Sequence, residues 1–202
     1  MKIAGVYLAG VFFGISLCAL FVGNGRAQEK ISTEQKGVKM KLTSSAFNEG
    51  GMIPRKHTCD SSDLSPQLKI SELPAGTKSL AIICDDPDAP VGTWVHWVIF
   101  NLPPSLRELP EGIARELHPT INGDSSKAAV QGINDFRRFG YGGPCPPPGS
   151  AHRYFFKLYA LDTILDFDAA SLKTGVTSSI LKAKVKGHVL AETALMGKYK
   201  RQ

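Results

Sequence analysis

An acidic loop followed by a histidine is the densest group of chemically useful side chains in this sequence. Asp86 and Asp88 lie in the run Asp85–Pro90 (DDPDAP), where two prolines stiffen the backbone. His96 follows between two tryptophans. A rigid carboxylate and an imidazole among aromatic rings could form a small polar pocket. Turn chemistry alone also explains the Asp and Pro residues, and His96 would then be a partly buried structural residue.

Two predicted strands hold this loop, Ser79–Cys84 before it and Trp94–Leu102 after it. A third strand is predicted over Ala151–Asp162, where apolar and polar residues alternate. Shorter strands are predicted at Val38–Ser44 and at Leu68–Ile70. Several short strands joined by long connections rich in Pro and Gly predict a mainly β fold, a β-sandwich.

Helices are predicted only near the end of the chain. Asp168–Thr174 is typical of a short helix, because Asp168 can cap its first turn and Gly175 can end it. Residues Thr177–Lys200 carry apolar side chains at helical spacing, although Gly187 interrupts the pattern. We therefore expect a C-terminal helix appended to the sandwich.

The first 27 residues resemble a secretory signal peptide. Lys2 precedes the apolar run Ile3–Val22, and Gly25-Arg26-Ala27 offers small residues at a cleavage site. The alternative is an uncleaved membrane anchor, because the apolar run approaches the length of a span. Cleavage would leave a domain over residues 38–200 in a secreted or periplasmic protein, with no membrane span.

Length and charge limit the class of protein. A chain of 202 residues with net charge +6 fits one domain with a sizeable core. Loss of residues 1–27 removes Lys2 and Arg26, which lowers the charge to +4. No basic run is interleaved with aromatic residues, so we expect no nucleic-acid groove.

Three cysteines remain once Cys18 is removed with the leader: Cys59, Cys84 and Cys145. Cys84 ends an apolar strand and is expected to be a buried thiol. Cys59 and Cys145 lie in turn-rich segments and are the better pair for a disulfide in an oxidising compartment. The sequence leaves open that all three are free thiols.

The order of four motifs resembles one known family. Asp86–Pro90 is followed by Trp94–Trp97, then Gly142–Pro144, then His152–Tyr154. With this spacing the chain resembles the phosphatidylethanolamine-binding protein family, also called Raf kinase inhibitor-like proteins, in its bacterial and archaeal branch. The resemblance implies a Greek-key β-sandwich with one pocket for a phosphate-bearing headgroup or small oxyanion.

The motif positions imply which residues line that pocket: Asp86, His96, Gly143, Pro144, His152 and Tyr154. Two histidines can donate hydrogen bonds and carry positive charge near neutral pH. A glycine amide can approach an oxyanion closely, and a tyrosine can donate its hydroxyl. Asp86 is expected to orient a histidine ring or to meet a ligand proton or ammonium group.

Arg153 is interpreted as a structural residue, and His188 has two interpretations. Arg153 alternates with His152 and Tyr154, so we expect it to face away and to pair with a carboxylate such as Asp88. His188 is either a pocket residue or a plain surface histidine.

Enzymatic classes find little support in the sequence. There is no Gly-x-Ser-x-Gly elbow, no standard zinc-ligand spacing, and no glycine-rich loop joining a strand to a helix. We therefore expect a non-catalytic protein without a cofactor that binds a small phosphate or phosphoester ligand. The alternative is an interaction module that inhibits a kinase or a protease through the loops around the pocket.

Overall fold

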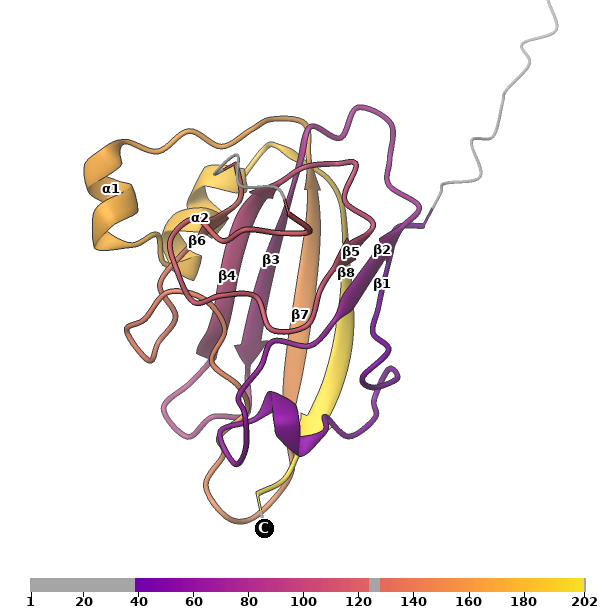
Figure 1. Cartoon of the computed structure of the whole chain (residues 1–202), viewed down its shortest axis with the longest axis vertical. Coiled ribbons are helices and arrows are strands. Elements are labelled where there is room, and N and C mark those ends of the chain that lie inside the picture. The colour runs from indigo at the N-terminus through magenta and orange to yellow at the C-terminus, as the bar shows by residue number, and fades with distance from the viewer. Residues whose placement is uncertain (1–38, 124–127, 202) are drawn as a thin grey trace, which may run out of the picture. The chain divides into compact units, whose positions relative to one another are not determined.

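The computed structural model describes residues 39–123 and 128–201 (Figure 1). The predicted signal peptide, residues 1–27, lies outside the described residues. The described part holds eight strands, two α-helices and one 3₁₀-helix. In chain order the elements are β1 (Lys41–Thr43), η1 (Arg55–His57), β2 (Leu68–Ser71), β3 (Ser79–Asp86), β4 (Trp94–Leu102), β5 (Glu108–Leu109), β6 (Val130–Gln131), β7 (His152–Leu161), α1 (Ala169–Thr174), α2 (Ser178–Val185) and β8 (Val189–Tyr199).

These strands form two antiparallel sheets, which confirms the predicted mainly β sandwich. The small sheet has the order β1-β2-β5 and the large one β6-β4-β3-β7-β8. In the large sheet β3 pairs with β4, its neighbour in sequence, and with β7, which the chain reaches only after a long connection. This crossover brings the acidic loop after β3 beside the start of β7.

Apolar side chains cover both faces of the large sheet. One face packs against the small sheet in a core that includes Ile82, Trp97, Phe156 and Leu68. The other face packs against α2, whose Leu181 joins a second cluster. Strands β3 and β4 are buried on both faces, so they form a rigid platform for the residues at their ends.

The short helix α1 confirms the sequence prediction. The Asp168 side chain accepts a hydrogen bond from the Ser171 amide (2.8 Å), which satisfies one free N–H of the first turn. Gly175 follows with φ 98°, a conformation that suits glycine.

The predicted helix over Thr177–Lys200 is wrong in its second half. Helix α2 ends at Val185, and Gly187 has φ 86°, so the chain turns there. The remaining residues form β8, which pairs along β7 from His152↔Tyr199 to Leu161↔Val189. None of the helices in the described ranges is long and apolar enough to cross a membrane.

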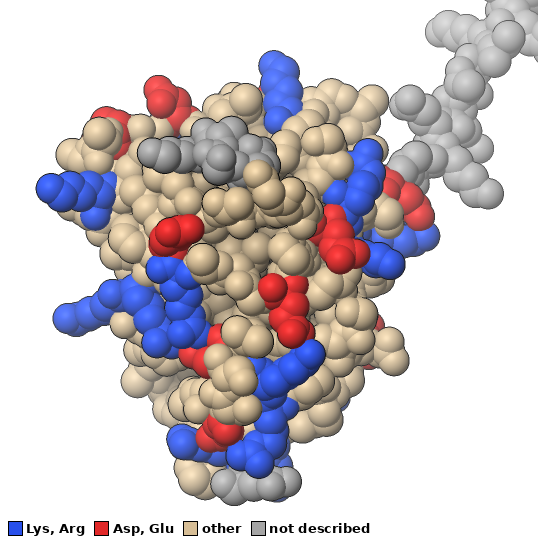
Figure 2. Space-filling model, in the orientation of Figure 1, with Lys and Arg blue, Asp and Glu red and all other residues tan. Residues whose placement is uncertain are grey.

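Charged side chains of both signs are interspersed on the face shown in Figure 2.

Candidate ligand-binding cavity

A β-bulge positions the first histidine. Cys84 pairs with Trp97 and Asp85 pairs with Val95, which leaves His96 as an extra residue on β4. Val95 packs into the helix-side cluster, whereas the His96 ring turns to the other side and lines a cavity. The bulge therefore delivers the imidazole to the site.

Asp86 holds the second histidine at the same cavity. It is the last residue of β3 and is 3% exposed. Its Oδ2 lies 2.8 Å from Nδ1 of His152, and because a carboxylate accepts, Nδ1 is the donor. Its Oδ1 accepts the amide hydrogen of Asp88 (2.8 Å). Asp86 thus orients His152 and stiffens the acidic loop, as expected for one of its two predicted roles.

His96 is fixed by backbone and aromatic contacts. Its Nδ1 donates to the carbonyl of Gly142 (2.6 Å), which leaves Nε2 as the ring nitrogen available to a ligand. The rings of Tyr154 and Phe136 meet the imidazole edge-on, with centroids at 5.1 and 5.3 Å. Burial lowers the pKa of His96, although the Gly142 carbonyl opposes this shift. The ring is therefore neutral near pH 7 in the free protein.

The cavity has a volume of about 180 Å³. Three polar side chains, Asp86, His96 and His152, meet in it. The remaining lining residues are mostly apolar: Ala89, Pro90, Val91, Trp94, Phe136, Cys145, Pro146 and Pro147. The lining contains no Lys or Arg. Charge complementarity to an anion would therefore come from protonated imidazoles.

Arg153 lies outside the cavity, as predicted. Its guanidinium pairs with both oxygens of Asp88, at 2.7 and 2.9 Å, and its side chain is half exposed. Its amide also donates to Asp88 (2.9 Å). This pair holds the acidic loop against the start of β7.

Gly143 and Pro144 differ from their expected roles, because neither lines the cavity. The Gly143 amide already donates to Oδ1 of Asp63 (2.7 Å). A Cβ at Gly143 would clash with the His57 carbonyl oxygen, so glycine is needed there for close packing. The Pro144 carbonyl accepts from the Cys59 amide (3.1 Å). Both residues therefore contribute to the backbone packing of the cavity rim and not to its lining.

Tyr154 packs against His96 but does not line the cavity. It is fully buried beside His96, and its hydroxyl has no hydrogen-bond partner within normal geometry among the described residues. Burial and the nearby Asp86 carboxylate raise the pKa of Tyr154. His188 is exposed, pairs with Asp162 (2.8 Å) and is absent from the lining, so it is a surface residue.

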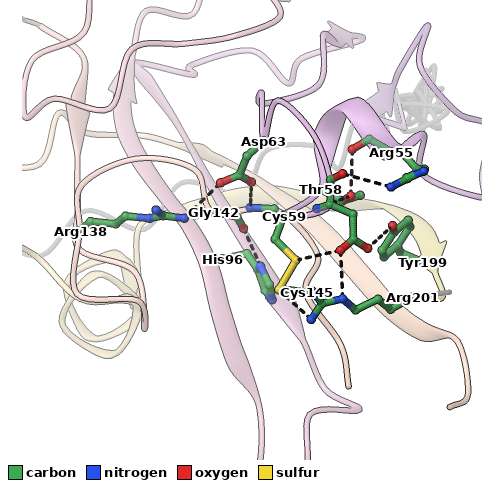
Figure 3. Close-up of a disulfide and its surroundings, with 12 residues drawn as sticks. Arg55, Thr58, Cys59, Asp63, His96, Arg138, Gly142, Cys145, Tyr199 and Arg201 are labelled. Carbon is green, nitrogen blue, oxygen red and sulfur yellow. Dashed lines mark hydrogen bonds and ion pairs between the residues drawn. A yellow bond between two sulfur atoms is a disulfide. The ribbon is translucent and has the colours of Figure 1, made fainter. Parts of the chain in front are cut away.

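A disulfide anchors the rim loop. Cys59 and Cys145 are joined with an S–S distance of 2.09 Å and a Cα–Cα distance of 5.4 Å, and Cys84 is a free, buried thiol. Figure 3 shows the disulfide with His96 on one side and Tyr199 and Arg55 on the other. Cys145 itself lines the cavity, so the bond fixes one wall to the loop after η1.

Sequence reasoning missed two supports of this site. Phe136 forms part of the lining, and Asp63 holds the rim through the Gly143 amide and ion pairs with Arg115 and Arg138 (2.6 and 3.2 Å). Both come from stretches without periodicity, Val130–Tyr141 and Asp60–Pro66. No group of His, Cys, Asp and Glu within the described ranges could hold a metal ion.

Comparison with known proteins decides the family. The family model described as phosphatidylethanolamine-binding protein matches residues 43–200. The chain belongs to this family. A UPF0098 protein of Methanothermobacter thermautotrophicus is 47% identical over 162 residues, which cover 80% of this chain and 99% of that protein. A UPF0098 protein of Aquifex aeolicus is 43% identical over 166 residues, which cover 82% and 91% of the two chains.

Two solved structures of the phosphatidylethanolamine-binding protein family have the same fold. One is a homologue from Chlamydia trachomatis, with a TM-score of 0.70 and 39% identity, covering 82% of this chain and 99% of that one. The other is YbcL of E. coli, described as a member of the mammalian family, with a TM-score of 0.70 and 31% identity, covering 81% and 99%. The fold and family expected from the four motifs are thus confirmed.

Proposed function

We propose that this protein is an exported, non-catalytic binding protein for a small ligand that carries a phosphate or similar oxyanion group. The observation that carries the proposal is the meeting of Asp86, His96 and His152 at one cavity. Asp86 and His96 come from the successive strands β3 and β4, whereas His152 comes from β7, which is far from them in sequence. Rigid strands hold them, as a preformed ligand site requires.

The hydrogen bonds favour an anion at the two Nε2 atoms. Nδ1 of each histidine is already engaged, His152 with Asp86 and His96 with the Gly142 carbonyl. Protonation therefore places an N–H on each Nε2, aimed at a ligand. A bound anion would offset the free-energy cost of protonating His96, because charge-assisted hydrogen bonds are strong in a buried site. Asp86 suits a ligand that also carries a proton or an ammonium group.

The lining offers no hydroxyl, amine or free thiol, since its one cysteine, Cys145, is in the disulfide. Asp86, His96 and His152 are the groups in it that could act as acid, base or nucleophile. Both oxygens of Asp86 and the Nδ1 atoms of both histidines are engaged in hydrogen bonds, which supports the proposal of reversible binding.

The proposed export follows from the N-terminal sequence. It is tested by determining the N-terminal residue of the protein recovered from the periplasm or medium, which should be Gln28.

Isothermal titration calorimetry with inorganic phosphate and with phosphoethanolamine tests the binding. We expect His96→Ala to weaken both at least tenfold, because it removes one of two charge-assisted donors. His188→Ala is the matched control, since His188 is exposed and paired with Asp162, and it should bind like the wild type. Equal affinity of His96→Ala and the wild type contradicts the proposal.

Two further outcomes separate the alternatives. Release of phosphate from phosphoethanolamine that disappears in His152→Ala would identify a hydrolase. The interaction-module alternative rests on the rim, where the Val91 side chain is 79% exposed. A kinase or protease bound by the wild type but not by Val91→Asp, together with no anion binding, would favour that function.

A further inference from the structure

A second and larger cavity lies on the other side of the disulfide. Its volume is about 310 Å³, at the lower end of the range for small-molecule sites. The lining comprises Met52, Ile53, Pro54, Arg55, Asp60, Tyr199 and Lys200. None of these residues lines the first cavity. Asp60 directly follows Cys59, and Figure 3 shows Arg55 and Tyr199 on the side of the disulfide away from His96.

Two cations in this lining, Arg55 and Lys200, form no ion pair with the residues that the structure describes. Within residues 39–123 and 128–201, no carboxylate lies within ion-pair distance of Arg55 or Lys200. Arg55 uses one nitrogen on the Asp60 backbone carbonyl, at 3.3 Å. Its other N–H groups and the Lys200 ammonium remain available as donors.

The one acid in the lining is already satisfied. Oδ2 of Asp60 accepts from the Tyr199 hydroxyl (2.6 Å), and Oδ1 pairs with Nε of Arg201 (3.0 Å). The hydrogen bond from Tyr199 and the charges of Arg201 and Arg55 lower the pKa of Asp60 and keep it ionised. Arg55 and Lys200 outnumber this one carboxylate, so the lining carries a net positive charge.

Apolar residues around Met52 and Ile53 form another wall of this cavity. Met52 is a large apolar residue that is 56% exposed, whereas Ile53 beside it is buried. The backbone of this wall is fixed to β8, because the Ile53 amide donates to the Lys198 carbonyl (2.7 Å) and the Lys198 amide donates to the Gly51 carbonyl (2.8 Å). The wall is therefore formed before any ligand arrives.

We propose that this cavity is a second ligand site, independent of the first, that takes a small organic anion with an apolar body. The anionic head would pair with Arg55 and Lys200. A short hydrocarbon chain would lie on Met52 and Pro54. A carboxylate with a chain of five or six carbons fits this combination of charge and size.

Titration of the full-length protein with hexanoate, followed by amide chemical shifts, tests the proposal. We expect saturable shifts near Arg55 and Tyr199. The double variant Arg55→Gln/Lys200→Gln should weaken binding at least tenfold, because both charged donors are lost. Both side chains are exposed, so the variant should keep the wild-type melting temperature.

Three controls make the result specific. Lys56→Gln removes a neighbouring surface charge that is paired with Glu111 outside the cavity, and His96→Ala disables the first site. Both should bind hexanoate like the wild type. Hexanol has the same apolar body without charge and should bind at least tenfold more weakly. Absence of saturable shifts, equal binding of hexanol, or an equal loss in Lys56→Gln would overturn the proposal.

Discussion

Asp85 and Asp86 are neighbours in sequence, equally buried, and opposite in role. They are 1% and 3% exposed, and strand alternation points them to opposite faces of the large sheet. Asp85 faces the helix side, where its carboxylate meets Lys157 of β7 (2.7 Å) and Lys182 of α2 (3.9 Å). Asp86 faces the cavity, where it meets His152.

The difference lies in the partners. The Asp85 carboxylate meets two lysines away from the cavity and links β3 to β7 and α2. Asp86 instead orients the imidazole of His152, which itself lines the cavity. We therefore propose that the partners of Asp85 stabilise the fold, whereas the partner of Asp86 serves the proposed anion binding. The following predictions test this division.

Loss of the disulfide should have the largest effect on stability. The bond ties the cavity rim to the loop after η1. Cys59→Ser/Cys145→Ser should lower the free energy of unfolding by about 3 kcal/mol, because the unfolded chain gains freedom. Urea denaturation measures this. Wild-type protein treated with a dithiol should approach the variant, and the variant itself should not respond. Equal stability of the two oxidised proteins would show that the rim needs no covalent anchor.

The helix face should respond to Asp85→Asn with a loss of roughly 2 kcal/mol in the free energy of unfolding. The substitution breaks a buried ion pair, but the Lys157 side chain is 35% exposed and can be hydrated, which limits the loss. The affinity for phosphate should not change. Asp162→Asn, in an exposed pair with His188, is the matched control and should leave both quantities nearly unchanged. A phosphate affinity that falls with Asp85→Asn would break the division between faces.

The cavity face should bind anions more tightly as the pH falls. Burial holds the pKa of free His96 below its usual 6.5, and a bound anion raises it, so binding takes up a proton. Sulfate avoids titration of the ligand itself. Its affinity should fall steadily from pH 5 to pH 8, and His96→Ala should flatten the curve. A pH-independent affinity in the wild type would exclude a protonated imidazole at the anion.

Stability without a ligand should show the opposite trend. A histidine whose pKa is lower in the folded state than in the unfolded state makes the folded state lose stability as the pH falls below the unfolded pKa. The free protein should therefore become less stable below about pH 6.5. Sulfate should offset that loss in the wild type and offset less of it in His96→Ala, as thermal unfolding would show.

The strands that carry the site could be predicted from the sequence, because apolar runs and alternation mark them. The bulge at His96 could not, since it depends on how β4 pairs with β3. The sequence does predict that Asp86 orients a histidine ring, which the structure identifies as that of His152. The contact of the Gly143 amide with Asp63 could not be predicted, because it joins loops with no periodic signal.

The error at β8 has a physical origin that the sequence does contain. Leu195, Gly197 and Tyr199 are buried at every second position, which is the period of a strand. Leu181 and Val185 carry the period of a helix just before them. The two patterns merge into one apparent helix unless Gly187 is taken as the point where one ends.

Arg153→Ala should have the smallest effect, and it shows how the acidic loop is held. The pair with Asp88 is partly exposed, with the Arg153 side chain 50% and the Asp88 side chain 28% exposed, and such pairs contribute little to stability. Hydrogen bonds from Arg153 hold the pKa of Asp88 at about 2, below its usual 3.8. A carboxyl group whose pKa is lower in the folded state than in the unfolded state contributes its full stabilisation at a pH above the unfolded-state pKa. That stabilisation is lost as the pH falls through the folded-state pKa. The variant should therefore move the Asp88 carboxyl titration, followed by NMR, towards 3.8. If this pKa shifts while the sulfate affinity at pH 5 is unchanged, Arg153 has a structural role only. If sulfate binding weakens, the ion pair of Arg153 with Asp88 must hold the acidic loop in place for Asp86 to serve the cavity.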